Sequence, residues 1–456
     1  MQHKSALSVT ILLASAFFSA PSAANWTDAV DQRIAGDRSG VCLVATRIQD
    51  EVEHAASCAD AGVDRELDAR SRFEIGSISK ALQGLLVAVL VERGELDLDQ
   101  PVAEIWAEQT IPGDSEAPIR LRHLLTHTSG LPRLPTGFVP ADMSNPYDGF
   151  DRSALLEALA NTELEAKPGE AFAYSNFGAM LLAQALVDLT GQGLEALFDR
   201  HVFGPLGMED TGLSGPTVQG HDASGEAVPN WDFDGDLGGV GAIRSTPADM
   251  AKWLVALLRP EGSELAAALE RSQQALIEVG GQTVGYGWLH LPLGDGQVLA
   301  HDGGTGGFSS FAVVDPGHER ASLILMDTSM LMQNSLADLA FHLIDPDYPL
   351  ASPQRPALAA EGEVLEHYVG RYGLYQGDEP FLGDFTLDFT VDQGELLIQA
   401  SVGGQVQPRI PLSSEGEGRF VQADLDLSIE FERDAAGQVV GLDFQQGPLS
   451  LDGRRQ

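Results

Sequence analysis

Residues 73–94 read Phe-Glu-Ile-Gly-Ser-Ile-Ser-Lys-Ala-Leu-Gln-Gly-Leu-Leu-Val-Ala-Val-Leu-Val-Glu-Arg-Gly. Residues 81–91 are hydrophobic on nearly all sides and Gly94 ends the run, which is the pattern of a buried helix with a glycine stop. Ser77 then lies in the first turn, where unpaired backbone N–H groups and the helix dipole favour a negative charge. Lys80 follows three residues later, so the two side chains share one face of the helix.

A serine hydroxyl is a weak nucleophile until a base takes its proton. A lysine can act as that base only when burial or another cation lowers its pKa from about 10.4. Lys80, one turn into a buried helix, meets that requirement, so Ser77 and Lys80 are candidates for nucleophile and base. The alternative is a capping serine followed by a surface lysine. The scarcity of lysine favours the first interpretation, because beyond Lys4 the only others are Lys167 and Lys252.

The first 24 residues have a lysine near the start, an apolar centre and a small-residue end, which predicts a secretory signal over residues 1–24. We therefore expect a periplasmic or secreted protein. No other run of the sequence approaches membrane-spanning length, so we expect no integral membrane segment in the mature chain. The formal charge of -40 argues against nucleic acid or an anionic membrane as partner.

Two cysteines, Cys42 and Cys58, lie in strand-like segments at residues 41–48 and 52–58. A hairpin centred near Asp50 places them opposite each other. In an exported protein this arrangement favours a cross-strand disulfide. Two reduced thiols are the alternative.

His123 and His127 are spaced i, i+4 on a short amphipathic helix, as some metal ligands are. The glutamate of the zinc-protease motif is absent and no third ligand is indicated. We therefore expect structural roles for both histidines and no metal site. Residues 133–151, rich in proline, glycine and aromatic side chains, read as a surface loop overhanging a pocket.

Residues 168–177 form a turn that enters a long apolar helix at residues 180–189, stopped by Gly191. Tyr174 and Asn176, two apart at the helix entrance, can both project into a cleft. A tyrosine near a lysine ammonium ionises more readily and can relay protons, while an amide can orient both lysine and substrate. A core tyrosine and a capping asparagine are the alternative.

Residues 299–315 fit a strand, a glycine-rich bend and a second strand, with a further strand at residues 321–326. His301, Gly303 and Gly304 would form an edge along which a substrate backbone can lie close, with the Gly304 N–H as a donor. The alternative is a glycine loop that only turns the chain.

The C-terminal part differs in composition from the rest. Residues 344–360 are rich in proline and alanine and read as a linker. Beyond it, short alternating stretches separated by turns predict a small antiparallel barrel or sandwich at residues 361–456. The predicted strands are residues 385–392, 396–400, 425–431 and 440–444.

Ser77-Ile-Ser-Lys80, Tyr174-Ser-Asn176 and His301-Asp-Gly303 resemble, in order and separation, the three motifs of the serine β-lactamase-related family. That family includes class C β-lactamases, penicillin-binding D,D-peptidases, esterases and D-amino-acid peptidases. The resemblance spans residues 73–329. Residues 361–456 are similar to the lipocalin-like domain appended to some members.

The resemblance implies an α/β fold of the β-lactamase/D,D-peptidase type at residues 25–343, with an antiparallel sheet flanked by helices and a helical subdomain. It implies that Ser77 attacks a carbonyl while Lys80 and Tyr174 share the proton transfers. The oxyanion would bind the N–H groups of Ser77 and Gly304. Asn176 would hold the substrate amide and the Lys80 ammonium, and no metal or organic cofactor is expected.

One departure from the family concerns His301-Asp302-Gly303, where true β-lactamases have Lys-Thr-Gly. The family's lysine grips a carboxylate as a fixed cation, whereas histidine is mostly neutral near pH 7. We therefore expect an esterase or peptidase acting on ester, amide or D-amino-acid peptide substrates. The alternatives are a class C-type β-lactamase or D,D-carboxypeptidase, and a non-hydrolysing penicillin-binding or cell-wall-binding receptor.

An α/β-hydrolase triad with His301 as base is excluded by the lack of a Gly-x-Ser-x-Gly motif. The sequence leaves the physiological substrate and the oligomeric state open.

Overall fold

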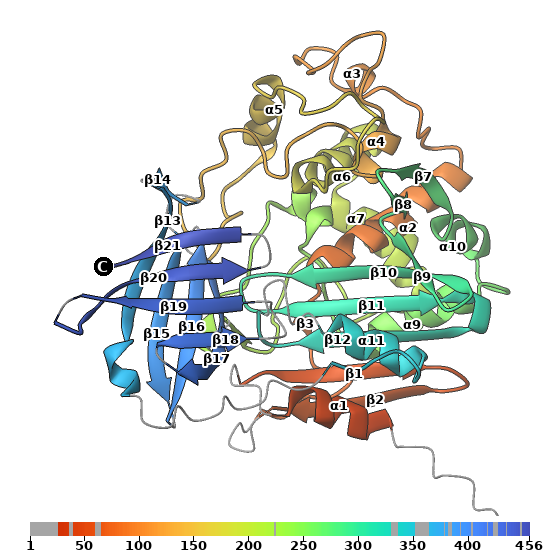
Figure 1. The fold of residues 1–456 in the computed structure, drawn as a ribbon. Helices are drawn as coiled ribbons and strands as arrows, with labels where there is room; N and C mark the ends of the chain where they lie inside the picture. Colours follow the sequence, from red (N-terminus) through yellow and green to blue (C-terminus); the bar gives the residue numbers. More distant parts are fainter. Residues whose placement is uncertain are drawn as a thin grey trace, which may run out of the picture.

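The structure is a computed structural model that describes residues 26–35, 40–59, 65–222, 225–329, 336–351 and 364–456, the last range without residues 378, 382–384, 393, 403–404, 417, 423–426, 435 and 447–448. The predicted signal and residues 352–360 of the predicted linker lie outside the described residues. An antiparallel sheet with helices on both faces is followed by a closed antiparallel barrel (Figure 1). The predicted fold class is confirmed.

The main sheet has eight strands in the order β2-β1-β12-β11-β10-β9-β8-β7, and all neighbours are antiparallel. The strands predicted near residue 45 and near residues 299–326 occupy its centre. The strands are β1 (Cys42–Ile48), β2 (Val52–Cys58), β7 (Ala275–Val279), β8 (Gln282–Gly285), β9 (Leu289–Leu293), β10 (Gly296–Gly304), β11 (Ser309–Asp315) and β12 (Arg320–Met326).

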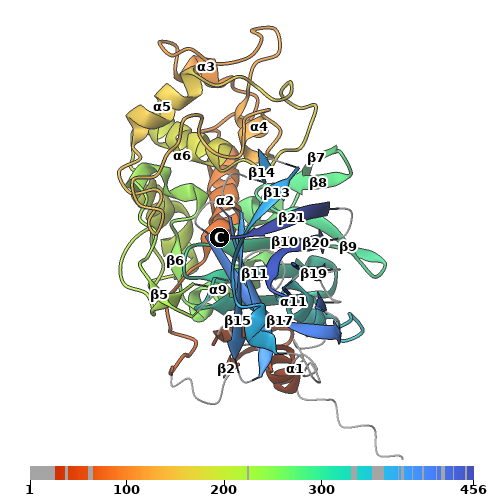
Figure 2. The same ribbon diagram turned by 60° about the vertical axis from the view of Figure 1, so that its left-hand side comes forward.

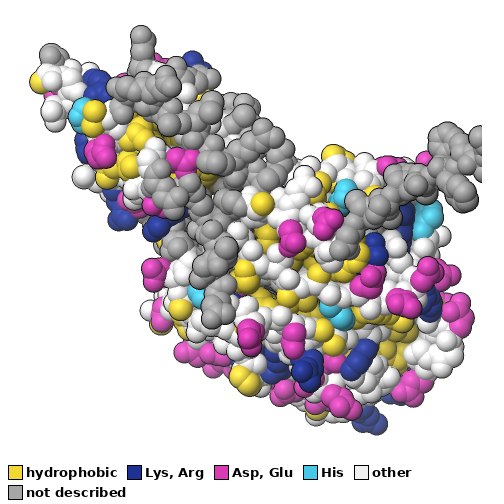
Figure 3. Space-filling model, turned by 90° about the horizontal axis from the view of Figure 1, so that it is seen from below, with side chains coloured by type: hydrophobic (Ala, Val, Ile, Leu, Met, Phe, Trp, Pro, Cys, Tyr) yellow, Lys and Arg dark blue, Asp and Glu magenta, His cyan; other side chains and the backbone are white. Residues whose placement is uncertain are grey.

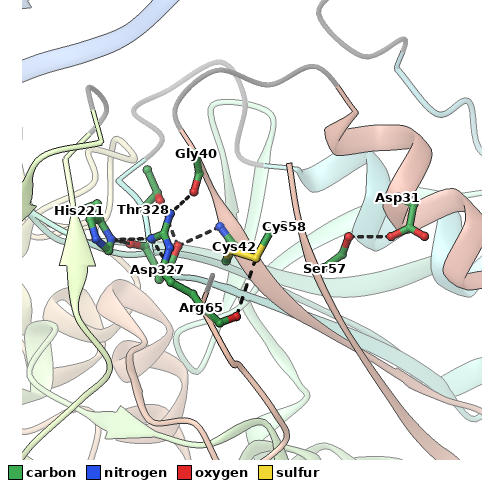
Figure 4. Close-up of a disulfide and its surroundings, with 9 residues drawn as sticks. All are labelled: Asp31, Gly40, Cys42, Ser57, Cys58, Arg65, His221, Asp327 and Thr328. Carbon is green, nitrogen blue, oxygen red and sulfur yellow. Dashed lines mark hydrogen bonds and ion pairs between the residues drawn. A yellow bond between two sulfur atoms is a disulfide. The ribbon is translucent and has the colours of Figure 1, made fainter. Parts of the chain in front are cut away.

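The β1–β2 hairpin carries the predicted disulfide. Cys42 and Cys58 are register partners and their sulfur atoms are bonded. Arg65 lies beside this bridge, where it pairs with the Asp327 carboxylate at 2.6 Å and also donates to the Gly40 carbonyl (Figure 4). Asp327 in turn accepts the Cys42 N–H at 2.9 Å, so this hydrogen bond joins the start of β1 to the residue that follows β12.

Side-chain alternation in the central strands divides the core into two layers, because successive residues of a strand point to opposite faces. One face packs against α1 (Trp26–Ile34) and α11 (Ala337–Ile344). The other face carries the remaining helices, which lie behind and above the sheet in Figure 1. The first layer includes Leu43, Ala45, Ile324 and Met326, and the second includes Val44, Leu323 and Leu325.

The helix α2 (Ser79–Glu92) is buried along nearly its whole length, which explains why its sequence is hydrophobic on all sides. It lies between the sheet and the helical subdomain in both ribbon views (Figures 1 and 2). The other helices are α3 (Val102–Ile105), α4 (Leu121–Leu125), α5 (Arg152–Ala160), α6 (Asn176–Thr190), α7 (Leu194–Phe198), α8 (Gly204–Leu206), α9 (Pro247–Leu258) and α10 (Ala266–Ser272).

Short elements complete this part of the chain. The strands β3 (Phe73–Glu74) and β6 (Arg244–Ser245) pair with each other, as do β4 (Gly220–His221) and β5 (Ala227–Val228). Short 3-10 helices are η1 (Gly76–Ile78), η3 (Gly235–Val240), η4 (Pro316–His318) and η5 (Leu365–His367), and η2 (Asp199–Phe203) is a short π-helix.

The C-terminal strands form a closed barrel because β13 pairs with both β15 and β21. Its interior is filled by packed aromatic rings, among them Tyr368, Tyr372 and Phe431. The strands are β13 (Gly370–Gln376), β14 (Glu379–Pro380), β15 (Thr386–Asp392), β16 (Glu395–Val402), β17 (Gln405–Gly416), β18 (Arg419–Gln422), β19 (Leu427–Arg433), β20 (Val439–Gln446) and β21 (Leu449–Arg455).

Among the described residues, no helix combines the length and the hydrophobicity needed to cross a bilayer. On the face seen from below, acidic and basic side chains are interspersed (Figure 3). The acidic excess of the sequence is therefore not gathered into one patch on this face.

Candidate active site

The turn that carries Ser77 depends on two close backbone approaches. Gly76 has φ +51°, in the left-handed region that favours glycine, and a Cβ there would lie 2.4 Å from the Gly304 amide nitrogen. A Cβ on Gly303 would lie 2.2 Å from the Ile75 carbonyl oxygen and 3.0 Å from the Ser77 amide nitrogen. The end of β10 therefore packs directly against η1, which brings the Ser77 and Gly304 amides to one place.

Lys80 lies one turn after Ser77, at the start of α2. Its Nζ is 3.0 Å from the Ser77 Oγ and donates to the Val240 carbonyl at 2.6 Å. The side chain is only 4% exposed, and burial lowers the pKa of Lys80 from 10.5 to about 7, with a smaller lowering from Arg133 and an opposing effect of Asp302. About half of the Lys80 amines are thus neutral at neutral pH and able to accept the Ser77 proton.

Tyr174 joins the same site from the turn before α6. Its ring centroid is 5.1 Å from the Lys80 Nζ and 4.5 Å from the His127 ring centroid. Burial raises the pKa of Tyr174 above its usual value, and hydrogen bonding with Ser77 opposes this only in part. The sequence predicted that the Tyr174 hydroxyl would ionise more readily beside Lys80. Desolvation has the opposite effect, and the phenol stays protonated near pH 7.

Asn176 is the first residue of α6, but it does not cap the helix. Ser175 is the N-cap, and its Oγ accepts the Gly178 N–H at 2.9 Å. The Asn176 Nδ2 donates to the Tyr147 hydroxyl at 3.4 Å, and its Oδ1 is buried without a hydrogen-bond partner among the described residues. The Lys80 ammonium is held by the Val240 carbonyl instead of by Asn176, so the amide oxygen remains available to a substrate N–H.

Tyr147 was not singled out by the sequence, although it belongs to the loop at residues 133–151 that was expected to overhang a pocket. Its ring stacks between Phe138 and Phe233, at centroid distances of 5.4 and 4.6 Å. The Asn145 amide and Asp232 also exchange hydrogen bonds of 2.7 and 3.2 Å, which fix the loop to the chain before η3. Position in an aromatic-rich loop was the only signal available for Tyr147.

His301 lies where β10 loses one of its neighbours. The strand β9 pairs with β10 only along residues 296–300, so residues 301–304 pair with β11 alone and leave a free edge. His301 is buried, which lowers its pKa, and its Nδ1 is 2.6 Å from the Asp302 carbonyl oxygen. That contact assigns the hydrogen to Nδ1, so the neutral ring keeps an unprotonated Nε2.

The two histidines that were weighed as metal ligands have structural contacts. The His123 Nδ1 accepts the Arg120 N–H at 3.1 Å, and the His127 Nδ1 accepts the Ser175 N–H at 3.2 Å. Burial lowers the pKa of both rings, to about 4 for His123. His127 also supports the Tyr174 ring by direct packing.

The chain is similar to known proteins over most of its length. The family model described as Beta-lactamase matches residues 26–341. Penicillin-binding protein 4* of Bacillus subtilis (strain 168) is 25% identical over 410 residues, covering 83% of this chain and 86% of that protein. A stretch that covers 83% of the chain is longer than residues 1–341, so the similarity to this protein extends beyond the family match into the C-terminal part.

Other relatives carry different names. The D-alanyl-D-alanine-carboxypeptidase/endopeptidase AmpH of Escherichia coli (strain K12) is 27% identical, covering 62% of this chain and 79% of that protein. Esterase EstB of Burkholderia gladioli is 31% identical, covering 57% of this chain and 74% of that protein.

A solved structure also shares the fold. The β-lactamase/D-alanine carboxypeptidase of Yersinia pestis, complexed with citrate, has a TM-score of 0.59 at 23% identity, covering 70% of this chain and 99% of that one. Because the family model matches well over half of the residues, the chain belongs to the Beta-lactamase family.

Proposed function

We propose that this protein is an exported serine hydrolase that acts through an acyl-enzyme on Ser77. The observation that carries the proposal is the 3.0 Å contact between the Ser77 Oγ and the Lys80 Nζ, together with a Lys80 pKa of about 7. A nucleophile within hydrogen-bond reach of a base that is partly neutral at working pH is the requirement for this chemistry.

The proton steps follow from the two pKa values. The neutral Lys80 amine takes the Ser77 proton as Oγ attacks the substrate carbonyl, and the Ser77 and Gly304 N–H groups receive the oxyanion, at about 3 kcal/mol per donor. Collapse of the tetrahedral intermediate breaks the bond to the leaving group, which receives the proton from Lys80 by way of the Tyr174 hydroxyl. Water then attacks the acyl-enzyme, gives its proton to the same base, and releases the acid.

The substrate preference that we propose is for esters, amides or D-amino-acid peptides over β-lactams. The buried His301 ring has a lowered pKa and is neutral near pH 7, so it offers no fixed cation to the carboxylate of a penicillin. The free Asn176 Oδ1 suits a substrate with an amide N–H. The name of the Burkholderia gladioli relative is consistent with an esterase.

The decisive test is Ser77→Ala, assayed with p-nitrophenyl esters, D-amino-acid amides and a chromogenic cephalosporin side by side. We expect hydrolysis to be lost while the circular dichroism spectrum and thermal unfolding are retained, because only one half-buried hydroxyl is removed. Ser153→Ala, an exposed serine on α5, is the matched control and should keep full activity. Full activity of Ser77→Ala would overturn the proposal.

A second candidate function is supported by the relatives named as penicillin-binding proteins and as a carboxypeptidase. A class C-type β-lactamase or D,D-carboxypeptidase would turn over the cephalosporin or a D-alanyl-D-alanine peptide faster than any ester. A non-hydrolysing receptor would form a stable Ser77 adduct, visible by mass spectrometry, with no turnover of any substrate.

The same proposal covers the organisation of the chain. We infer a cleaved signal at residues 1–24, a catalytic domain at 25–343, a linker at 344–360 and the barrel domain at 361–456, in a periplasmic or secreted protein. The disulfide between Cys42 and Cys58 supports export, because such bridges persist in oxidising compartments. N-terminal sequencing of the exported protein should start close to residue 25.

A further inference from the structure

Ser310 carries a buried hydroxyl beside the nucleophile turn that the proposed reaction does not use. It lies on β11, the strand between β10 and β12 in the middle of the main sheet (Figure 1), and it is 1% exposed. Its Oγ donates a hydrogen bond of 2.8 Å to the carbonyl oxygen of Ile75, which lies 235 residues earlier in the chain. This bond therefore ties the centre of the sheet to the residue two positions before Ser77.

The alternation along the strands places this hydroxyl on the face of the sheet that carries the site. Ala312 on β11 and Leu299 on β10 both belong to the core layer that contains α2. Ser310 lies two residues before Ala312 and Gly303 lies four after Leu299, so both point to that same face, and they are register partners. A Cβ on Gly303 would lie 2.4 Å from the Ser310 Oγ and 3.0 Å from the Ser77 amide nitrogen. Ser310 therefore lies directly beneath the contact between β10 and η1.

The carbonyl that Ser310 holds influences where the Ser77 N–H points. Gly76 separates the Ile75 carbonyl from the Ser77 amide, and it has no side chain to restrict its two backbone torsions. Its conformation therefore depends on what holds the residues on either side. The Ile75 carbonyl also accepts the Ile78 N–H, at 3.3 Å, which is longer than the bond from Ser310. The hydrogen bond from β11 thus fixes the start of the turn and, through Gly76, the direction of the Ser77 N–H.

The two amides that are proposed to bind the oxyanion meet at this turn. The Gly304 amide nitrogen would lie 2.4 Å from a Cβ on Gly76, so the end of β10 is held closely against the turn. Gly304 is itself fixed by its pairing with β11. A displacement of the Ile75 carbonyl would therefore move the Ser77 amide relative to the Gly304 amide. Such donors have to point at one position within about 0.5 Å to act together.

We infer that Ser310 is a positioning residue for the oxyanion hole, where it holds the Ser77 N–H in the direction that stabilises the tetrahedral intermediate. The inference rests on the proposed hydrolase function and adds to it a residue that is too buried to touch the substrate. Because the hydrogen bond acts through the backbone, its loss should affect the transition state more than substrate binding. Removal of an oxyanion donor lowers the rate about 100- to 1,000-fold, so a misplaced donor should lower it on the order of 30-fold.

The test compares Ser310→Ala with Ser322→Ala, which is its matched control. Ser322 is also a buried serine of the main sheet, and its Oγ donates to the Ala340 carbonyl of α11 at 2.6 Å, on the opposite face. Each variant loses one buried hydrogen bond from a hydroxyl to a carbonyl, so the two should lose similar thermal stability. We expect kcat/KM for a p-nitrophenyl ester to fall on the order of 30-fold in Ser310→Ala and to stay within about two-fold in Ser322→Ala.

A second substrate separates damage to the oxyanion hole from a general loss of structure. In the matching thionoester, sulfur replaces the carbonyl oxygen, and its larger, weakly accepting anion fits the two amide donors poorly. The wild type should therefore prefer the ester, and the ester-to-thionoester ratio of kcat/KM should fall on the order of ten-fold in Ser310→Ala. Ser322→Ala should keep the wild-type ratio. A Ser310→Ala variant with the wild-type kcat/KM, or with a lower kcat/KM and an unchanged ratio, would overturn the inference.

A binding measurement separates failure of this inference from failure of the proposed function. Phenylboronic acid forms a tetrahedral adduct with a serine hydroxyl without turnover, so calorimetry should show its affinity weakened on the order of ten-fold in Ser310→Ala and unchanged in Ser322→Ala. If the wild type hydrolysed the ester and the two variants behaved alike, the inference would be wrong and the hydrolase would stand. A wild type that hydrolysed no ester but bound the acid with this pattern would support the role of Ser310 and contradict the hydrolase. A wild type that did neither would contradict both.

Discussion

Burial of Lys80 predicts a pH-dependent stability that can be measured without any substrate. The side chain is 4% exposed and its pKa falls from 10.5 to about 7 on burial. One pKa unit corresponds to about 1.36 kcal/mol, so the protonated Lys80 destabilises the folded state by about 5 kcal/mol relative to the neutral amine.

The sign follows from proton binding in the two states. Between pH 7 and 10.5 the unfolded chain keeps the Lys80 proton while the folded chain has released it. Because the unfolded state binds more protons in this window, the contribution of Lys80 to stability rises with pH, by about 1.4 kcal/mol per unit. Between pH 6 and pH 8.5 this amounts to about 2 kcal/mol.

The perturbation is Lys80→Met, which fills the same space without a titratable group. We expect the free energy of unfolding of this variant, minus that of the wild type, to fall by about 2 kcal/mol from pH 6 to pH 8.5. The lost hydrogen bonds to Ser77 and Val240 contribute a similar cost at both pH values and nearly cancel in this difference. Hydrolytic activity should be lost at both.

Urea denaturation followed by tryptophan fluorescence is the assay, because all five tryptophans lie before residue 289 and report on the sheet and its helices, not on the barrel. The control is Lys167→Met, an exposed lysine whose replacement should give a pH-independent difference. A stability difference for Lys80→Met that stays constant across this pH range would falsify the reasoning, since Lys80 would then be no better a base than a surface lysine.

Three further predictions concern catalysis. The kcat/KM for a neutral ester should rise with pH through an apparent pKa of about 7, as Lys80 deprotonates, and a flat profile would contradict its role as base. Gly303→Ala should lower kcat/KM on the order of 100-fold, because the added Cβ would lie 2.2 Å from the Ile75 carbonyl oxygen. Gly296→Ala is the control and should retain activity, because the nearest atom to its added Cβ is 3.8 Å away. Equal losses of activity in the two variants would refute this explanation. Tyr147→Phe removes the hydroxyl that accepts a hydrogen bond from Asn176, and it should raise KM about five-fold for substrates whose amide N–H reaches Asn176. An equal rise in KM for esters that lack this N–H would exclude a role of Tyr147 in positioning Asn176.

Local sequence patterns predicted many of the elements correctly. The apolar run after Ser77 forms α2, the residues on either side of Asp50 form the hairpin with its disulfide, and Gly191 ends α6 in the left-handed conformation. These features depend on neighbouring residues alone, through periodicity, turn chemistry and the glycine at the helix end.

Other strands carried weaker signals and were not predicted. The strand β9 contains Pro292, and β7 and β8 are short and partly exposed. In the barrel, β13, β17, β18 and β21 are rich in polar or small residues, and pairing with already formed neighbours holds them in place. Strand formation here depends on tertiary partners more than on intrinsic preference.

The sequence by itself determined which residues are the candidates for the chemistry, because the motifs around Ser77, Tyr174 and His301 are recognised from their order and separation along the chain. Only the tertiary structure decided how those groups behave. The protonated state of Tyr174, the lowered pKa of Lys80 and the partnership of Asn176 with Tyr147 all depend on side chains that come from distant segments. Desolvation and hydrogen bonding are properties of the packed environment, and a linear pattern does not specify them.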